Sequence, residues 1–371
     1  MSYHFIPYQP KYREEIIRLQ TALWGSDLSL NSAYLAWKYE QNPYLDEPLI
    51  YLALQNEHVV GMRALYATQW EIGQTGQTVI LPCTADTLIG REHRNYGLLR
   101  QLMRFLHDDG ALKAFPYIFS FSAAAPVYFC ALSEGWRVIG AYNTLARTAP
   151  LRRVLKLERL KNWIQRHPSL DTSWTVAAQL RQSVSVAAHL RRKSSWRGHI
   201  HSSQDPRPEE MASLVARSDR PDKIRQHKDS RYYAWRFRSP LSRYRFFYWQ
   251  KTTLEGFLVL STRFTFGPFY LVDWAATTTE VLTDLLQAAV QDVGLGSLEI
   301  WSATLPDAMV TTLGERGFMR ASSSTPDTSY RPGLLGQCVN SALLDGEWSL
   351  GGRDVTDIEN WELRMVCGDQ Y

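Results

Sequence analysis

The feature that most constrains this chain of 371 residues is an internal duplication. The stretch AYLAWKYEQNP (residues 33–43) matches RYYAWRFRSP (residues 231–240), and both copies reach a proline. The paired positions are Tyr34 with Tyr232, Ala36 with Ala234, Trp37 with Trp235, Lys38 with Arg236, and Tyr39 with Phe237. A segment that recurs at this separation indicates two structural units of one kind.

The sequence that follows each matched segment supports the same duplication. Both continue into a predicted β-hairpin, LIYLALQNEHVVGMRAL and RFFYWQKTTLEGFLVL, in which a glutamine precedes a glycine at the same spacing. Farther on, residues 117–136 and 298–318 each predict a strand, a helix that opens at a proline, and an end in Gly plus an aromatic residue. The pattern predicts a duplicated α/β unit, and the chain length also favours two domains.

A basic segment lies between the two predicted units. Residues 151–197 contain 11 Lys and Arg against only Glu158 and Asp171, so they hold the positive surplus of a chain whose net charge is +4. Apolar residues recur there at helical spacing, which predicts a basic helical connector. We therefore expect an N-terminal domain at 1–150, this connector, and a C-terminal domain at 198–371.

The composition excludes several classes of site and location. The longest apolar stretch, YIFSFSAAAPVYFCAL, contains serines and Pro126 and is shorter than a bilayer span, and the N-terminal residues lack a signal-peptide pattern. We therefore expect a soluble cytoplasmic protein without a transmembrane segment. The four cysteines lie far apart with no CxxC pair or Cys/His cluster, so we expect neither a disulfide framework nor a metal site.

The stretch HRNYGLLRQLMRFLHDDG (93–110) joins a predicted strand to a predicted helix. A β-branched-rich run at 79–89 precedes it, and apolar residues at helical spacing follow Tyr96 until Gly110. The unpaired N–H groups and the positive dipole end at such a helix start form an anion site, and Gly97 lets a ligand approach the backbone. The residues alone leave two interpretations open, a phosphate cradle and an ordinary loop that enters a helix.

The order of these elements resembles that of the GNAT superfamily of acyl-CoA N-acyltransferases, and the duplication resembles its tandem members. The loop motif of that family is Gln/Arg-x-x-Gly-x-Gly/Ala, which residues 94–99 resemble except that Leu99 replaces the small third residue. The resemblance implies two tandem GNAT-like mixed α/β sheets flanked by helices, with acetyl-CoA or another acyl-CoA as donor. The residues implied to bind CoA are Leu88 and Ile89 for the pantetheine arm, and Arg94, Asn95, Tyr96, Gly97, Leu98 and Leu99 for the pyrophosphate.

The chemistry that the resemblance implies needs an acid for the departing thiolate. The family usually places a tyrosine four residues before the Gly-aromatic pair, where this chain has Ala131. Tyr128 lies almost one helical turn earlier and is the candidate acid, and a core or pocket-wall tyrosine is the alternative.

The same chemistry needs a base for the proton of the attacking amine. Asp86 is the candidate because it is the only carboxylate in the otherwise apolar strand 79–89, and burial favours a carboxylate that accepts a proton. The alternatives are a strand-end aspartate bonded to nearby backbone, and Glu92 or His93 as the base. Members of the family also often use a water chain.

The second unit lacks an equivalent basic loop. Where the loop should lie, YLVDWAATTTEVLTDLLQ offers Asp273 and Glu280 without an arginine or a glycine, so a pyrophosphate would meet like charge. We expect this unit to supply walls of the acceptor site or the interface between the units. In some tandem members the end of the chain reaches the active site, which makes Asp369 and the carboxylate of Tyr371 further candidates.

The resemblance implies transfer of an acetyl or fatty acyl group from a CoA thioester to a primary amine, with the active site in residues 1–150. The acceptors that fit are a small-molecule amine, an amino sugar, and a lysine or ornithine side chain of a peptide. The alternative is a non-catalytic acyl-CoA-binding or scaffold protein with a degenerate site, which Ala131 and Leu99 favour.

The basic connector leaves three interpretations open. Its charge suits a solvated helix face, a docking surface for an anionic acyl-carrier protein or acidic leader peptide, or a peripheral contact with anionic lipid headgroups. Nucleic acid is not an expected partner, because no recognised nucleic-acid-binding module accompanies the charge.

Overall fold

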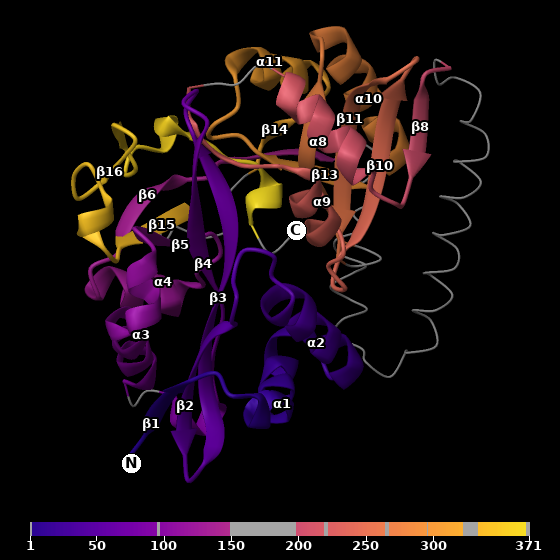
Figure 1. The fold of residues 1–371 in the computed structure, drawn as a ribbon. Helices are drawn as coiled ribbons and strands as arrows, with labels where there is room; N and C mark the ends of the chain where they lie inside the picture. The colour runs from indigo at the N-terminus through magenta and orange to yellow at the C-terminus, as the bar shows by residue number, and fades with distance from the viewer. Residues whose placement is uncertain are drawn as a thin grey trace, which may run out of the picture.

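The computed structural model describes residues 2–94, 97–148, 198–218, 222–263, 267–294, 296–321 and 333–368. Two large mixed sheets with helices packed beside them form this part of the protein, as Figure 1 shows. The arrangement confirms the predicted α/β fold of two mixed sheets flanked by helices. The expected connector at 151–197 lies outside the described residues, so its helical structure stays a prediction.

The first sheet comes mainly from the N-terminal half. In spatial order its strands are β1 (His4–Pro7), β2 (Leu49–Gln55), β3 (His58–Ile72), β4 (Gln77–Ile89), β5 (Tyr117–Ser120), β15 (Gly333–Cys338) and β6 (Arg137–Ala141). Two short strands extend it, β9 (Ile224–Gln226) beside β3 and β18 (Trp361–Glu362) beside β9. The helices α1 (Arg13–Trp24) and α2 (Leu28–Leu35) cover one face, and α3 (Leu98–Asp108) and α4 (Ala125–Ser133) cover the other (Figure 1).

The second sheet comes mainly from the C-terminal half. In spatial order its strands are β14 (Met319–Arg320), β7 (Thr144–Thr148), β13 (Ser297–Trp301), β12 (Phe269–Ala276), β11 (Leu254–Thr262), β10 (Arg243–Gln250) and β8 (Ile200–Ser203). Its helices are α8 (Pro208–Arg217), α9 (Ser230–Arg236), α10 (Thr279–Val293) and α11 (Asp307–Glu315). A small hairpin joins β16 (Ser349–Leu350) to β17 (Arg353–Asp354). Single helical turns lie at Pro10–Tyr12, Ala36–Glu40, Arg91–His93, Gly110–Ala114, Ser341–Leu343, Ile358–Asn360 and Met365–Cys367.

Local sequence explains the two longest strands and the helix that follows them. β3 and β4 pair antiparallel along their length, and the turn between them contains Gly73 and Gly76, both at positive φ, which glycine adopts without a steric cost. The strands are largely buried because helices cover both faces of the sheet. In α3, Leu98, Leu102 and Leu106 recur on one face and are buried against the sheet.

The two sheets exchange a strand. β7 leaves the N-terminal half and pairs with β13 and β14, while β15 leaves the C-terminal half and lies between β5 and β6. Near the crossing point, Tyr142 stacks on Trp301 with 3.8 Å between ring centroids. A division of the chain near residue 150 therefore leaves each sheet with a strand from the other half.

The two matched segments of the duplication meet directly. Trp37 stacks on Trp235, with ring centroids 5.4 Å apart and planes 18° apart. The indole Nε1 of Trp37 donates to the carbonyl oxygen of Trp235 at 2.7 Å, and Nε1 of Trp235 donates to the carbonyl oxygen of Trp37 at 2.9 Å. Such reciprocal contacts are the mark of a twofold interface, so the copies pack together like the halves of a symmetric dimer.

Candidate functional site

The loop that the sequence singled out begins where β4 ends. The backbone N–H of Gly90 donates to the carbonyl oxygen of Val60 at 2.8 Å, and Nε of the exposed Arg94 donates to that of Ile89 at 3.2 Å. Gly97 has φ +71° and precedes α3, whose first turn receives no capping hydrogen bond from any side chain that the structure describes. Glycine adopts this left-handed conformation without a steric cost, and the N–H groups of the first turn of α3 point toward the loop. Asn95 and Tyr96 lie outside the described residues.

The edge of β4 that faces β5 is unpaired over its last residues. β4 pairs with β3 as far as Ile89, but its parallel pairing with β5 consists of Cys83 opposite Phe119. Among the described residues, the β4 backbone from Thr84 to Ile89 therefore has no strand partner on that side. Leu88 and Ile89, the predicted pantetheine contacts, lie at the end of this edge, just before the loop.

A β-bulge interrupts the pairing of β3 and β4 beside this edge. Met62 pairs with Leu88 and Ala64 with Ala85, so Arg63 alone lies opposite both Asp86 and Thr87. Asp86 has φ +44°, a conformation that costs a non-glycine residue about 1–3 kcal/mol and that concentrates at functional sites. The bulge turns the Asp86 side chain toward α1 and α2.

Asp86 is 6% exposed and accepts hydrogen bonds from three side chains. The donors are Gln20 Nε2 at 3.1 Å, Tyr39 Oη at 2.8 Å and Tyr34 Oη at 3.4 Å. Lys38, which is fully buried, donates from Nζ to Tyr34 Oη at 2.7 Å. These hydrogen bonds give both buried oxygens of the Asp86 carboxylate a partner.

The sequence predicted Asp86 but not the side chains that bind it. Tyr34, Lys38 and Tyr39 all belong to the duplicated segment, so the sequence marked them for another reason. Gln20 is a buried residue of α1, and no motif in the sequence points to it. All three of these donors to Asp86 are side chains, and the choice between a catalytic and a structural role for this residue stays a prediction.

Several solved structures are similar to this chain, whereas no family model and no curated protein matches it. A conserved protein of unknown function from Enterococcus faecalis V583, described as a probable N-acyltransferase, superposes with a TM-score of 0.59 at 12% identity over 93% of this chain and 75% of that one. A GCN5-related N-acetyltransferase from Anabaena variabilis gives 0.56 at 10% identity, over 91% and 73%. Eis1 from Mycobacterium abscessus gives 0.50 at 14% identity, over 92% and 75%. The chain has a tandem GNAT fold.

Tyr128, the predicted acid, lies on the opposite face of the first GNAT sheet from the Asp86 carboxylate. It is buried on α4 in a hydrophobic cluster that includes Leu102 and Met103 of α3 and Trp136. Ala131, at the position usual for the family's tyrosine, is buried in the same cluster. The structure therefore does not bring the two predicted catalytic side chains face to face, and the role of each stays a prediction.

The second GNAT unit connects β12 to α10 without a loop of the first kind. Only Thr277 and Thr278 intervene, and Oγ1 of Thr278 caps the helix by accepting from the N–H of Val281 at 3.3 Å. The neighbouring Glu280 carboxylate has a lowered pKa because it accepts a hydrogen bond from its own backbone N–H and one from Thr278. A negative charge and an occupied cap at this helix start disfavour an anionic ligand, as expected from the sequence.

The buried carboxylate of the second unit, Asp273, belongs to an ion-pair network. It accepts from Lys228 Nζ at 2.6 Å, Tyr233 Oη at 3.0 Å and Arg364 Nη1 at 2.9 Å. Burial would raise the pKa of Asp273, but Lys228 and Arg364 outweigh it and lower the pKa below its ordinary value. Two cations hold this carboxylate ionised, which is typical of a structural ion pair.

The C-terminal segment lies between the two units. Tyr66 Oη donates to the carbonyl oxygen of Cys367 at 3.1 Å, Tyr232 Oη to that of Val366 at 3.2 Å, and Arg236 Nη2 to that of Gly368 at 2.8 Å. These bonds bring Gly368 to the junction of the two copies. Asp369 and Tyr371, the further candidates from the sequence, lie outside the described residues.

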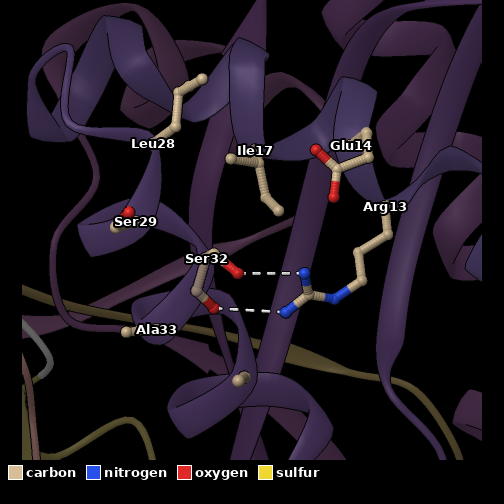
Figure 2. A pocket seen from close by; sticks show the side chains of 8 residues that line it. Arg13, Glu14, Ile17, Leu28, Ser29, Ser32 and Ala33 are labelled. Atoms are coloured by element: carbon tan, nitrogen blue, oxygen red, sulfur yellow. Dashed lines mark hydrogen bonds between the residues drawn. The ribbon is translucent and has the colours of Figure 1, made fainter.

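Two cavities lie beside α2, and residues of the loop and of β4 line neither of them. One, of about 430 Å³, lies between α1 and α2, where Arg13 donates to Oγ and the carbonyl oxygen of Ser32 at 3.0 and 3.3 Å (Figure 2). The other, of about 540 Å³, is lined by residues that include Trp37 and Trp235. Among the described residues, no group of His, Cys, Asp and Glu side chains could hold a metal ion, and no helix is long and apolar enough to cross a bilayer.

Proposed function

We propose that the protein is an N-acyltransferase that moves an acyl group from a CoA thioester to a primary amine, with its active site in residues 1–150. The observation that carries the proposal is the edge of β4 that has no strand partner among the described residues, followed along the chain by the left-handed Gly97 at the start of α3. The GNAT fold and its N-acetyltransferase neighbours support the same function.

In this proposal the donor lies along β4 with its phosphates at the loop. The backbone N–H groups of residues 95–99 bind the pyrophosphate at the positive end of the α3 dipole, and Arg94 adds a positive charge. The amide groups of the pantetheine arm extend the sheet by pairing with the free edge at Leu88 and Ile89, as a peptide does in β-strand addition. The thioester then lies farther along the edge, near Asp86 and Thr87.

The reaction needs one new bond and two proton movements. The amine nitrogen attacks the thioester carbonyl carbon, the C–N bond forms, and the C–S bond breaks to release the CoA thiolate. Asp86 takes the amine proton, directly or through the hydroxyl of Tyr39, and Tyr128 is the proposed donor of the proton that the thiolate takes up. The acceptor is a small-molecule amine, an amino sugar, or a lysine or ornithine side chain, and the acyl donor is an acyl-CoA.

The second candidate function is a non-catalytic acyl-CoA-binding protein. The observation that favours it is the burial of Tyr128 in the α3–α4 cluster, with Ala131 at the family's usual tyrosine position. The two functions predict the same donor binding and differ in turnover. Release of free CoA from acetyl-CoA or a long-chain acyl-CoA in the presence of a broad panel of primary amines supports the enzyme, and its complete absence favours the binding protein.

Gly97 provides the test of the donor site itself. Replacing Gly97 with valine is expected to raise the Kd for CoA by about 10- to 100-fold, because a β-branched residue at φ +71° costs about 1–3 kcal/mol and redirects the N–H groups of the loop. The matched control is Gly97→Asn, since asparagine tolerates the left-handed region and should keep most of the affinity. An added Cβ meets only the far end of Gln101 at 3.9 Å, so crowding does not explain a difference between the two variants. Native mass spectrometry with CoA measures both, and equal affinities would contradict the proposed site.

A further inference from the structure

Arg63 is a buried cation, and two of its three nitrogen atoms have no hydrogen-bond partner among the described residues. Its side chain lies on β3 opposite the β4 bulge, and the residue is 1% exposed. Nη1 donates to Oγ1 of Thr87 at 2.7 Å, but Nε and Nη2 have no hydrogen-bond partner among the described residues. Buried arginines are rare unless they are paired, and an unpaired buried charge costs several kcal/mol. The two free donors therefore require an explanation.

The side chain faces α3 and α4, away from the Asp86 carboxylate. The Arg63 guanidinium lies 5.6 Å from the ring centroid of Trp136, which belongs to the cluster beneath these helices. Burial lowers the pKa of Arg63 to about 10. Arg63 is thus a cation at neutral pH, and no described carboxylate forms an ion pair with it.

The two unused nitrogens have a specific geometry. Nε and Nη2 lie along one edge of the planar guanidinium, and their N–H bonds run parallel on that edge. This fork matches the two oxygens of a carboxylate, and such bidentate pairs are the strong form of arginine recognition. A single oxygen, such as that of a thioester carbonyl, would use only part of it.

The position of Arg63 along β4 indicates which part of a ligand would reach it. Its partner Thr87 directly precedes Leu88, where the proposed pantetheine pairing begins, on the side away from the pyrophosphate loop. At about 3.3 Å per strand residue, Thr87 is nearer to the thioester end of the donor than to its phosphates. An anion that belongs to the acyl group would therefore lie next to the fork, whereas the phosphates of CoA would not.

We propose that the donor's acyl group ends in a carboxylate and that Arg63 binds this carboxylate through Nε and Nη2, which makes the substrate a CoA thioester of a short dicarboxylic acid. The inference rests on the proposed function, because it needs the donor to lie along β4. It deepens that function by naming the acyl class, and it makes Arg63 the residue that selects it. Transfer of this acyl group converts the acceptor amine to an amide, and the free carboxylate of the acyl group gives the product a new negative charge.

The test compares the binding of three probes to the full chain by isothermal titration calorimetry: CoA, butyryl-CoA and succinyl-CoA. The two thioesters share a four-carbon acyl chain and differ in the terminal carboxylate. Wild type is expected to bind succinyl-CoA about 10- to 100-fold more tightly than butyryl-CoA, as a charged hydrogen-bond pair implies. Arg63→Met should abolish this preference and leave the affinity for CoA unchanged, and Arg63→Lys should keep a reduced preference because it retains the charge without the fork.

The matched control is Arg104→Met, which removes an exposed arginine from α3 on the same side of the sheet and should change none of the three affinities. Equal binding of succinyl-CoA and butyryl-CoA by wild type, with CoA bound, would overturn the acyl assignment and leave the proposed function standing. An equal loss of affinity for all three probes in Arg63→Met would also overturn the acyl assignment, since Arg63 would then bind a part of the molecule that all three probes share. If wild type binds none of the probes, the proposed function fails and this inference fails with it. The preference of wild type decides the question even if a variant does not fold.

Discussion

Replacing Asp86 with asparagine is expected to lower kcat by about 10²- to 10⁴-fold, the usual contribution of a positioned acid or base. The carboxylate accepts bonds from Gln20, Tyr34 and Tyr39, and asparagine is close to it in shape but cannot take up the amine proton. The KM for the acyl-CoA should change little, because the proposed donor contacts are backbone groups of β4 and the loop. The rate of release of free CoA with a primary amine acceptor measures both constants.

The second copy offers a matched control for this substitution. Asp273 is also a buried aspartate that accepts a hydrogen bond from a tyrosine, but it has Lys228 as a direct partner and lies in the unit that lacks the basic loop. Asp273→Asn should lower the thermal stability, since it leaves Lys228 and Arg364 without their shared carboxylate, and it should leave kcat of the folded enzyme near the wild-type value. A wild-type kcat for Asp86→Asn would show that Asp86 is structural, in the same way as Asp273.

The duplication was predictable from the sequence because its two best-preserved segments contact each other. Trp37 and Trp235 are bound by the same reciprocal contact, so both positions need the same large ring and the same indole N–H. The order of the strands in the two sheets was harder to predict from the sequence. β7 and β15 are short, and nothing in their residues specifies that each pairs in the sheet of the other half, because strand pairing depends on partners that are distant in the sequence.

The candidate site could be predicted only in part from the sequence, for a similar reason. Asp86 stood out as a charge in an apolar strand, but the bulge that turns it toward α1 is a change of register, which a pattern of alternating residues does not reveal. Its partners Gln20 and Tyr39 come from elements that only the tertiary structure brings to it. Arg63 carried a similar signal, a single charge within the otherwise apolar run 59–67, and that signal could have identified it.

The contact between Trp37 and Trp235 is expected to have the largest effect on stability. Trp37→Ala should lower the free energy of unfolding by about 3–5 kcal/mol, the usual cost of removing a large buried aromatic side chain, and Trp235→Ala should do the same. Each variant also loses one indole hydrogen bond to the other copy. Trp348→Ala is the control, because this half-buried ring packs on Tyr117 rather than on the other copy's tryptophan and should cost less. Urea unfolding followed by circular dichroism measures all three.

The double variant tests whether the two copies are one cooperative structure. Because Trp37 and Trp235 contact each other, removing both should cost less than the sum of the single losses, with a coupling of about 0.5–3 kcal/mol. The exchange of β7 and β15 ties each sheet to the other, so unfolding should remain a single transition in the wild type and in the single variants. Strictly additive losses, or two separate transitions in the wild type, would mean that the copies fold as independent units and that the twofold contact contributes little to holding them together.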